Sequence, residues 1–163
     1  MPDDFPGLPE LTLSLRSLGS LRGGGGPSAR VEQAQFFAPL LDARRRAASA
    51  KSSSEVLAAF SVARLGTSLD ELLHTLAAER FPDRPPARRA FEAELVDAAQ
   101  PLYTALRALR EETPPAGTPV GEDAWLRWLG ALRATFDAAD RAWRSIGESL
   151  ARVPARKPGG GKT

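Results

Sequence analysis

The expected fold is decided by two stretches of sequence, FEAELVDAAQPLYTALRAL (91–109) and WLRWLGALRATFDAADRAWRSIGESLARV (125–153). Apolar residues recur in both at alternating spacings of four and three: Phe91, Leu95, Ala98, Leu102, Ala105 and Leu109, then Trp125, Leu129, Leu132, Phe136, Ala139, Trp143, Ile146, Leu150 and Val153. Such a repeat places its members on one side of a helix. Residues 113–121, rich in proline and glycine, separate the two stretches. The sequence therefore predicts a long antiparallel helical hairpin.

The two arms of this hairpin differ in length and regularity. The second stretch is the longer one, so we expect its far end to meet the N-terminal helices or another copy of the chain. Pro101 lies inside the first stretch, and we expect it to bend that arm, because proline removes a helical hydrogen bond.

Residues 28–80 carry shorter helical patterns. An apolar stripe precedes the basic run at 44–46 and consists of Val31, Ala34, Phe37, Leu40 and Leu41. Pro39 lies within it and is expected to kink or divide this helix. Ser52 with Glu55 has the spacing of a capping box, and Ser68 with Glu71 repeats it after Gly66. The region 52–80 is thus either two short helices or one helix with a bend.

Composition agrees with an all-α helical bundle. Alanine, leucine, arginine and glutamate are abundant, and all four favour helix. The 22 basic and 20 acidic residues nearly balance, so no strong field gathers nucleic acid or an anionic membrane. With no cysteine, disulfides and thiolate metal sites are excluded. Neither a secretory signal nor a membrane-spanning stretch is recognisable, so a cytoplasmic protein is expected.

We expect three segments along the chain. Residues 1–27 read as a flexible leader that ends in the glycine linker 23–26, residues 28–153 as the helical bundle domain, and residues 154–163 as a disordered basic tail. The segment 11–22 (LTLSLRSLGSLR) stands out in the leader because it is rich in leucine. We expect it to bind a protein partner through Leu11, Leu13, Leu15, Leu18, Gly19, Leu21 and Arg22.

The end of this segment, Leu18-Gly19-Ser20-Leu21-Arg22-Gly23, resembles the targeting peptides of encapsulin cargo proteins, whose pattern is Leu-Thr-x-Gly-Ser-Leu-Arg. Leu11-Thr12 is similar to the opening of that pattern, with residues 14–18 separating the two parts. The resemblance implies a partner that is a protein shell, a cytoplasmic nanocompartment, and often iron or peroxide chemistry in the cargo. A leader that folds back on the bundle, or one that is simply disordered, is the alternative.

Only one weak metal-site pattern is present. Glu71 and His74 have the Glu-x-x-His spacing of ferritin-like iron sites, in which both side chains reach one metal. Both point away from the centre of the neighbouring leucine stripe, so a site needs a subunit interface that supplies Glu32, Glu92 or Glu94. An ordinary solvated helix surface is the alternative. His74 is the single histidine, which excludes a multi-histidine zinc site in one chain.

Two further groups of residues were considered as binding sites. Trp128 with the lone Tyr103 is a candidate lining for a flat cofactor such as a flavin, although core packing also explains the tryptophans. Arg30 with the arginines at 44–46 is a candidate phosphate patch, but a solvated helix face is favoured, because no aromatic residues interleave with these arginines as a nucleic-acid stacking surface requires.

These observations lead to two hypotheses for function. The first is an encapsulin-type cargo protein, expected to be a homo-oligomer, held by residues 11–22 and linked to iron storage or redox chemistry. The second is a non-enzymatic helical adaptor that binds a protein partner through its hairpin and its N-terminal segment. An enzyme with a conventional active site ranks third, because no catalytic constellation is recognisable.

Overall fold

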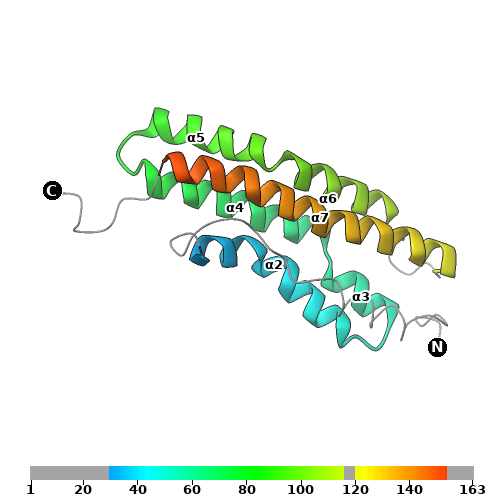
Figure 1. Ribbon diagram of the computed structural model, residues 1–163. Helices are drawn as coiled ribbons and strands as arrows, with labels where there is room; N and C mark the ends of the chain where they lie inside the picture. The colour runs from blue at the N-terminus through cyan, green and yellow to red at the C-terminus, as the bar shows by residue number, and fades with distance from the viewer. Residues whose placement is uncertain (1–29, 116–119, 154–163) are drawn as a thin grey trace.

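A computed structural model of the protein describes residues 30–115 and 120–153 (Figure 1). This described part is all-helical and contains no strand. Its helices are α2 (Arg30–Ala48), α3 (Ser53–Ala59), α4 (Val62–Arg80), α5 (Pro85–Ala98), α6 (Gln100–Glu112) and α7 (Glu122–Arg152). The predicted fold class, an all-α bundle that contains a long helical hairpin, is confirmed. The flexible leader and tail that we expected lie outside the described residues.

The hairpin is formed by α5 and α6 on one side and by α7 on the other. Figure 1 shows α5 and α6 following each other as one arm, with α7 running back beside them. The 31 residues of α7 span about 46 Å at 1.5 Å per residue. Its first half packs on α6 and its far half on α5, and α7 also contacts α2. The far end of the longer arm therefore meets an N-terminal helix of the same chain. This was one of the two expected contacts, the other being with another copy of the chain.

The first arm is divided at Ala99, where the sequence predicted only a bend. Pro101 is the second residue of α6 and has no N–H to continue the α5 ladder. The break shifts the buried positions by one residue, because Ala99 and Leu106 are buried while Ala98 and Ala105 are only half-buried. The seam predicted for α6 is therefore wrong at Ala105, and Leu106 takes its place.

The other helices complete a bundle around α7. α4 packs on α5 and α6, α2 packs on α4 and α7, and α3 packs on α2 (Figure 1). Aromatic side chains join these layers. Phe36 and Phe37 of α2 lie 5.4 and 6.3 Å from Trp143 of α7, and Phe60 lies 5.8 Å from Trp128. All five rings are buried, so α2 and the α3–α4 junction share one core with the hairpin.

The helix boundaries predicted from local sequence patterns agree with the structure only in part. The Ser52 cap is present, because its hydroxyl accepts a hydrogen bond from the Glu55 amide at 3.2 Å. The next helix begins after Ser61, and it continues through Gly66 and Ser68, so the second predicted cap does not exist. Pro39 does not divide α2, although Figure 1 shows the helix axis changing direction near its middle.

A buried arginine joins three helices at the end of the bundle where the described chain begins and ends. Nη1 of Arg80, at the end of α4, lies 2.6 Å from Oε2 of Glu32 in the first turn of α2. Nε of Arg80 donates a hydrogen bond of 3.0 Å to the carbonyl of Val153, directly after α7. The Arg80 side chain is only 3% exposed and that of Glu32 is 17% exposed. The start of α2 and the end of α7 are thus held together through the end of α4.

Candidate functional site

The structure pairs His74 of the Glu-x-x-His pattern with a carboxylate of a neighbouring helix. Glu71 and His74 both lie on the exposed side of α4. Nδ1 of His74 lies 2.9 Å from Oε1 of Glu92, which α5 supplies. Glu92 was predicted to reach His74 from a second subunit, but Glu92 contacts His74 within one chain. No contact within the described residues brings Glu71 to this pair.

A second polar contact lies one turn earlier on α4. The hydroxyl of Tyr103 on α6 donates a hydrogen bond to the carboxylate of Asp70. Burial raises the pKa of the Tyr103 phenol, and the adjacent Asp70 carboxylate and the charge of Glu92 raise this pKa further. The phenol therefore stays protonated well beyond the pH at which an ordinary tyrosine ionises. We call Asp70, His74, Glu92 and Tyr103 the α4–α5–α6 cluster.

This cluster cannot hold a metal ion by itself. Within residues 30–115 and 120–153, no three His, Asp or Glu side chains lie close enough together to share a metal. His74 is largely exposed, so water has free access to it. The arrangement supports a structural role. Neutral and charged hydrogen bonds between α4, α5 and α6 fix how these three helices pack against one another. An iron site that uses Glu71 and His74 therefore needs ligands from a second chain and stays a prediction.

Of the four cluster residues, only Asp70 was not a candidate from the sequence, but the contacts among the four were not predicted. Asp70 and His74 have helical i, i+4 spacing, which was a usable signal that they share one side of α4. Tyr103 lies 33 residues after Asp70, and only the packing of α6 on α4 brings them together. The pairing of His74 with Glu92 likewise depends on the packing of α5 on α4.

The structure gives Trp128 a role in the core. It is 1% exposed, its ring packs edge-on against Phe60 and Trp125, and its indole N–H donates a hydrogen bond of 3.2 Å to the Thr113 hydroxyl. A flat cofactor needs an open ring face for stacking, and these neighbours cover the Trp128 ring. Tyr103 is engaged with Asp70 instead. The packing alternative therefore describes Trp128 better than a flavin pocket.

The apolar seam of the hairpin is used inside the protein. The seam residues Leu132, Phe136, Trp143 and Ile146 of α7 are all buried. Large exposed apolar side chains in the described part are Val31 at the start of α2 and Leu126 near the start of α7. These two residues lie at opposite ends of the bundle and do not form one surface.

The predicted partner-binding residues, from Leu11 to Arg22, lie outside the described residues. The described chain begins with α2, whose first turn is tied to Arg80 through Glu32. The first turn of α2, which follows residues 1–29 in the chain, is therefore fixed to the rest of the bundle. No described helix combines the length and the apolar character that crossing a membrane requires. Comparisons of the chain with protein-family models, curated proteins and solved structures found no match.

Proposed function

We propose that this chain is a helical cargo protein of an encapsulin-type shell, to which residues 11–22 bind it. The observation that carries the proposal is the sequence Leu18-Gly19-Ser20-Leu21-Arg22-Gly23, which resembles the targeting peptides of such cargo. The proposal rests on sequence, because these residues lie outside the described part of the chain.

The chemistry of the segment suits docking on a protein wall. Leucine side chains fill shallow apolar pockets, Gly19 allows a bend, and Arg22 can pair with an acidic rim. Residues 23–29 then connect the segment to α2 and span at most about 25 Å when extended. This reach lets the body lie clear of the wall while the peptide is bound.

The fold favours this proposal over an adaptor that recognises its partner through the hairpin. Such an adaptor needs an apolar surface on α6 and α7, but their seam residues are buried in the protein's own core. A body that is complete without a partner is what a tethered passenger requires. Recognition by a partner is then assigned to the leader.

Co-expression with the encapsulin shell protein of the same genome tests the proposal. We expect the full chain to co-purify with assembled shells, and removal of residues 1–26 to abolish this. A double substitution, Leu18→Ser with Leu21→Ser, should abolish it as well while leaving the helical body folded. Removal of residues 154–163 is the matched control and should leave loading unchanged. Loading that persists without residues 1–26 would reject the proposal.

Sufficiency is tested by transfer. Residues 1–29 fused to a fluorescent protein should carry that protein into the shell, and the same fusion with the two serine substitutions should stay outside. Exclusion of both fusions would show that the leader alone carries no address.

A link to iron comes from the resemblance alone and needs ligands from a second copy of the chain. Aerobic oxidation of Fe(II) by the assembled protein tests it, with His74→Ala as the comparison. Equal background rates in both proteins end the iron proposal without affecting the loading proposal.

A further inference from the structure

A groove runs between α2 and the beginning of α4. One wall is the exposed side of α2 with Pro39, Asp42 and Arg46, and the other is the start of α4 with Arg64 and Ser68. The groove is open to solvent and has a volume of about 590 Å³. Its size therefore suits an organic ligand better than a single ion.

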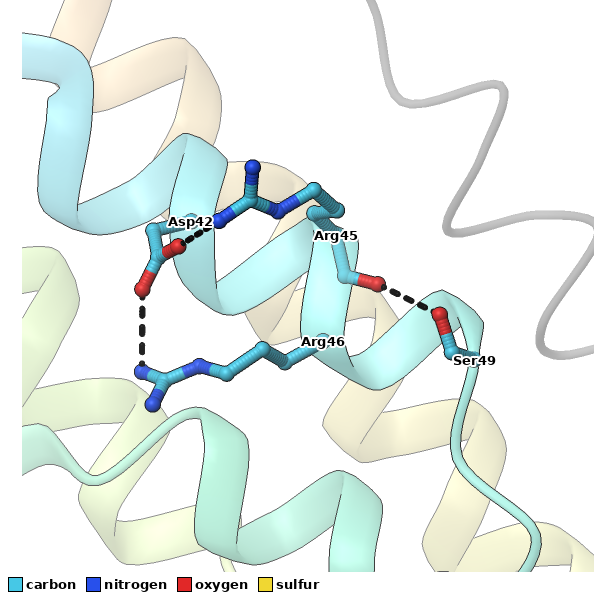
Figure 2. A network of polar contacts seen from close by, with 4 residues as sticks. All are labelled: Asp42, Arg45, Arg46 and Ser49. Carbon is cyan, nitrogen blue, oxygen red and sulfur yellow. Dashed lines mark hydrogen bonds and ion pairs between the residues drawn. The ribbon is translucent and has the colours of Figure 1, made fainter.

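The charges in this groove are unbalanced toward positive. The two oxygens of Asp42, the only carboxylate among the groove residues, face Arg45 and Arg46, as Figure 2 shows. Nη2 of Arg46 lies 3.4 Å from Oδ2 of Asp42, so Arg46 shares this single carboxylate with Arg45. No carboxylate of the described residues pairs with Arg64.

The start of α4 adds to this imbalance. Helices usually carry acidic side chains in the first turn, where they offset the positive end of the macrodipole. The first turn of α4 has no acidic residue and carries Arg64 instead. Ser61 and Ser68 place hydroxyl groups along the same groove. Arginines on both walls and hydroxyls on the α4 wall form a set of donors that suits a tetrahedral oxyanion.

We propose that the groove between α2 and α4 binds a small phosphate monoester through Arg46 and Arg64. The two guanidinium groups neutralise the phosphate from opposite walls, and the hydroxyls of Ser61 and Ser68 donate to its oxygens. The apolar part of the ligand lies on Pro39 and Leu65, which also line the groove. The sequence analysis considered Arg30 and the run 44–46 for this role; the groove retains Arg46 from that set and adds Arg64.

Titration with phenyl phosphate and with inorganic phosphate, at physiological salt and by calorimetry, tests this site on the full chain. We expect saturable binding of phenyl phosphate, and weaker binding of inorganic phosphate, because only the former covers Pro39 and Leu65. Arg64→Ala and Arg46→Ala should each weaken binding of phenyl phosphate about tenfold, as expected for losing a charged hydrogen-bond donor.

Arg133→Ala is the matched control, since Arg133 is an exposed arginine on α7 away from the groove, and affinity should not change. Amide chemical shifts in ¹⁵N spectra should move at 61–68 and near residue 46 in the same titration. Both arginines are exposed, so circular dichroism should show unchanged helix content in all three variants. Absence of saturation, or equal effects of Arg64→Ala and Arg133→Ala, overturns the proposal. Neither result bears on loading into a shell, which residues 1–26 decide.

Discussion

The Glu32–Arg80 pair offers a sharp test of how the bundle is held together. Arg80 is a cation at 3% side-chain exposure, and its carboxylate partner lies 2.6 Å away on another helix. Removal of Glu32 leaves the Arg80 guanidinium, in a medium that solvates a charge poorly, with only the Val153 carbonyl and the exposed carboxylate of Glu79, 3.8 Å away, among the described residues. We therefore expect Glu32→Ala to lower the free energy of unfolding by about 3–5 kcal/mol.

The reverse deletion should cost less. Arg80→Met keeps an apolar chain of similar shape in the core and leaves behind Glu32, which has some contact with water. The hydrogen bond to the Val153 carbonyl is lost as well, at about 1 kcal/mol. We expect Arg80→Met to cost about 1–3 kcal/mol and the double variant to cost no more than Glu32→Ala alone. The two substitutions should therefore be strongly non-additive.

Equilibrium unfolding in urea, followed by helix circular dichroism and tryptophan fluorescence, measures these values. The Arg127–Glu112 pair is the control, because it joins α7 to α6 at 3.5 Å with both side chains exposed. Glu112→Ala should cost less than about 1 kcal/mol. The reasoning fails if Glu32→Ala costs as little as Glu112→Ala, or if the double variant equals the sum of its single variants.

Three further predictions follow from individual contacts. Because the pKa of Tyr103 is raised above the ordinary value near 10, its protonated form stabilises the fold below about pH 10, and this contribution is lost as the pH rises further. Tyr103 is the single tyrosine, so phenolate absorbance should show a higher midpoint in the folded protein than in urea, and equal midpoints would contradict this. Ser52→Ala should cost about 1 kcal/mol by removing a helix cap, whereas Ser68→Ala, inside α4, should cost less than about 0.5 kcal/mol in the same urea assay. Leu106→Ala should cost about 2–5 kcal/mol, since Leu106 rather than its neighbour fills the seam, and a value below 1 kcal/mol would refute that register.

The hairpin was predictable because its signal is long and local. An apolar side chain recurs through nine positions from 125 to 153, and no strand pattern produces that spacing. The break at Ala99 was not predictable to the residue, since Pro101 shows only that the ladder must be interrupted nearby. Small residues at 98, 99 and 105 fit either register, so the packing of α6 on α7 decides which of them is buried.

The boundary between α3 and α4 shows where local patterns compete. Ser61 and Ser68 are both acceptable caps by sequence, and Gly66 favoured the later one. The structure uses Ser61, because a continuous helix from 62 to 80 buries Leu65, Leu69, Leu73 and Leu76 on one side. The chain turns at Phe60 so that this ring reaches Trp128 and Phe136. A long-range contact thus overrides the local signal that favoured Ser68.

The candidate site was only partly predictable, for the same reason. His74 and Glu92 were both named from sequence, but their direct contact depends on how α5 lies against α4. The hydrogen bond between Asp70 and Tyr103 had no local signal at all. The partner-binding residues from Leu11 to Arg22 rest on sequence alone.

Under the proposed function, the Arg80 contact would serve the stability of the body, and the leader would serve recognition. A leader bound to a shell would pull on the start of α2, and Glu32 in that first turn is held by Arg80, which also holds the end of α7. A pulling force on the leader would therefore be resisted by a buried ion pair in the core of the bundle, and not by the first turn of α2 alone. Glu32→Ala should therefore lower the free energy of unfolding and leave loading into the shell intact wherever the body stays folded. Leu18→Ser with Leu21→Ser should abolish loading and leave the free energy of unfolding unchanged. Two assays on the same two variants distinguish these roles: co-purification with shells and unfolding in urea. A leader variant that also unfolds the body would mean that the leader belongs to the core.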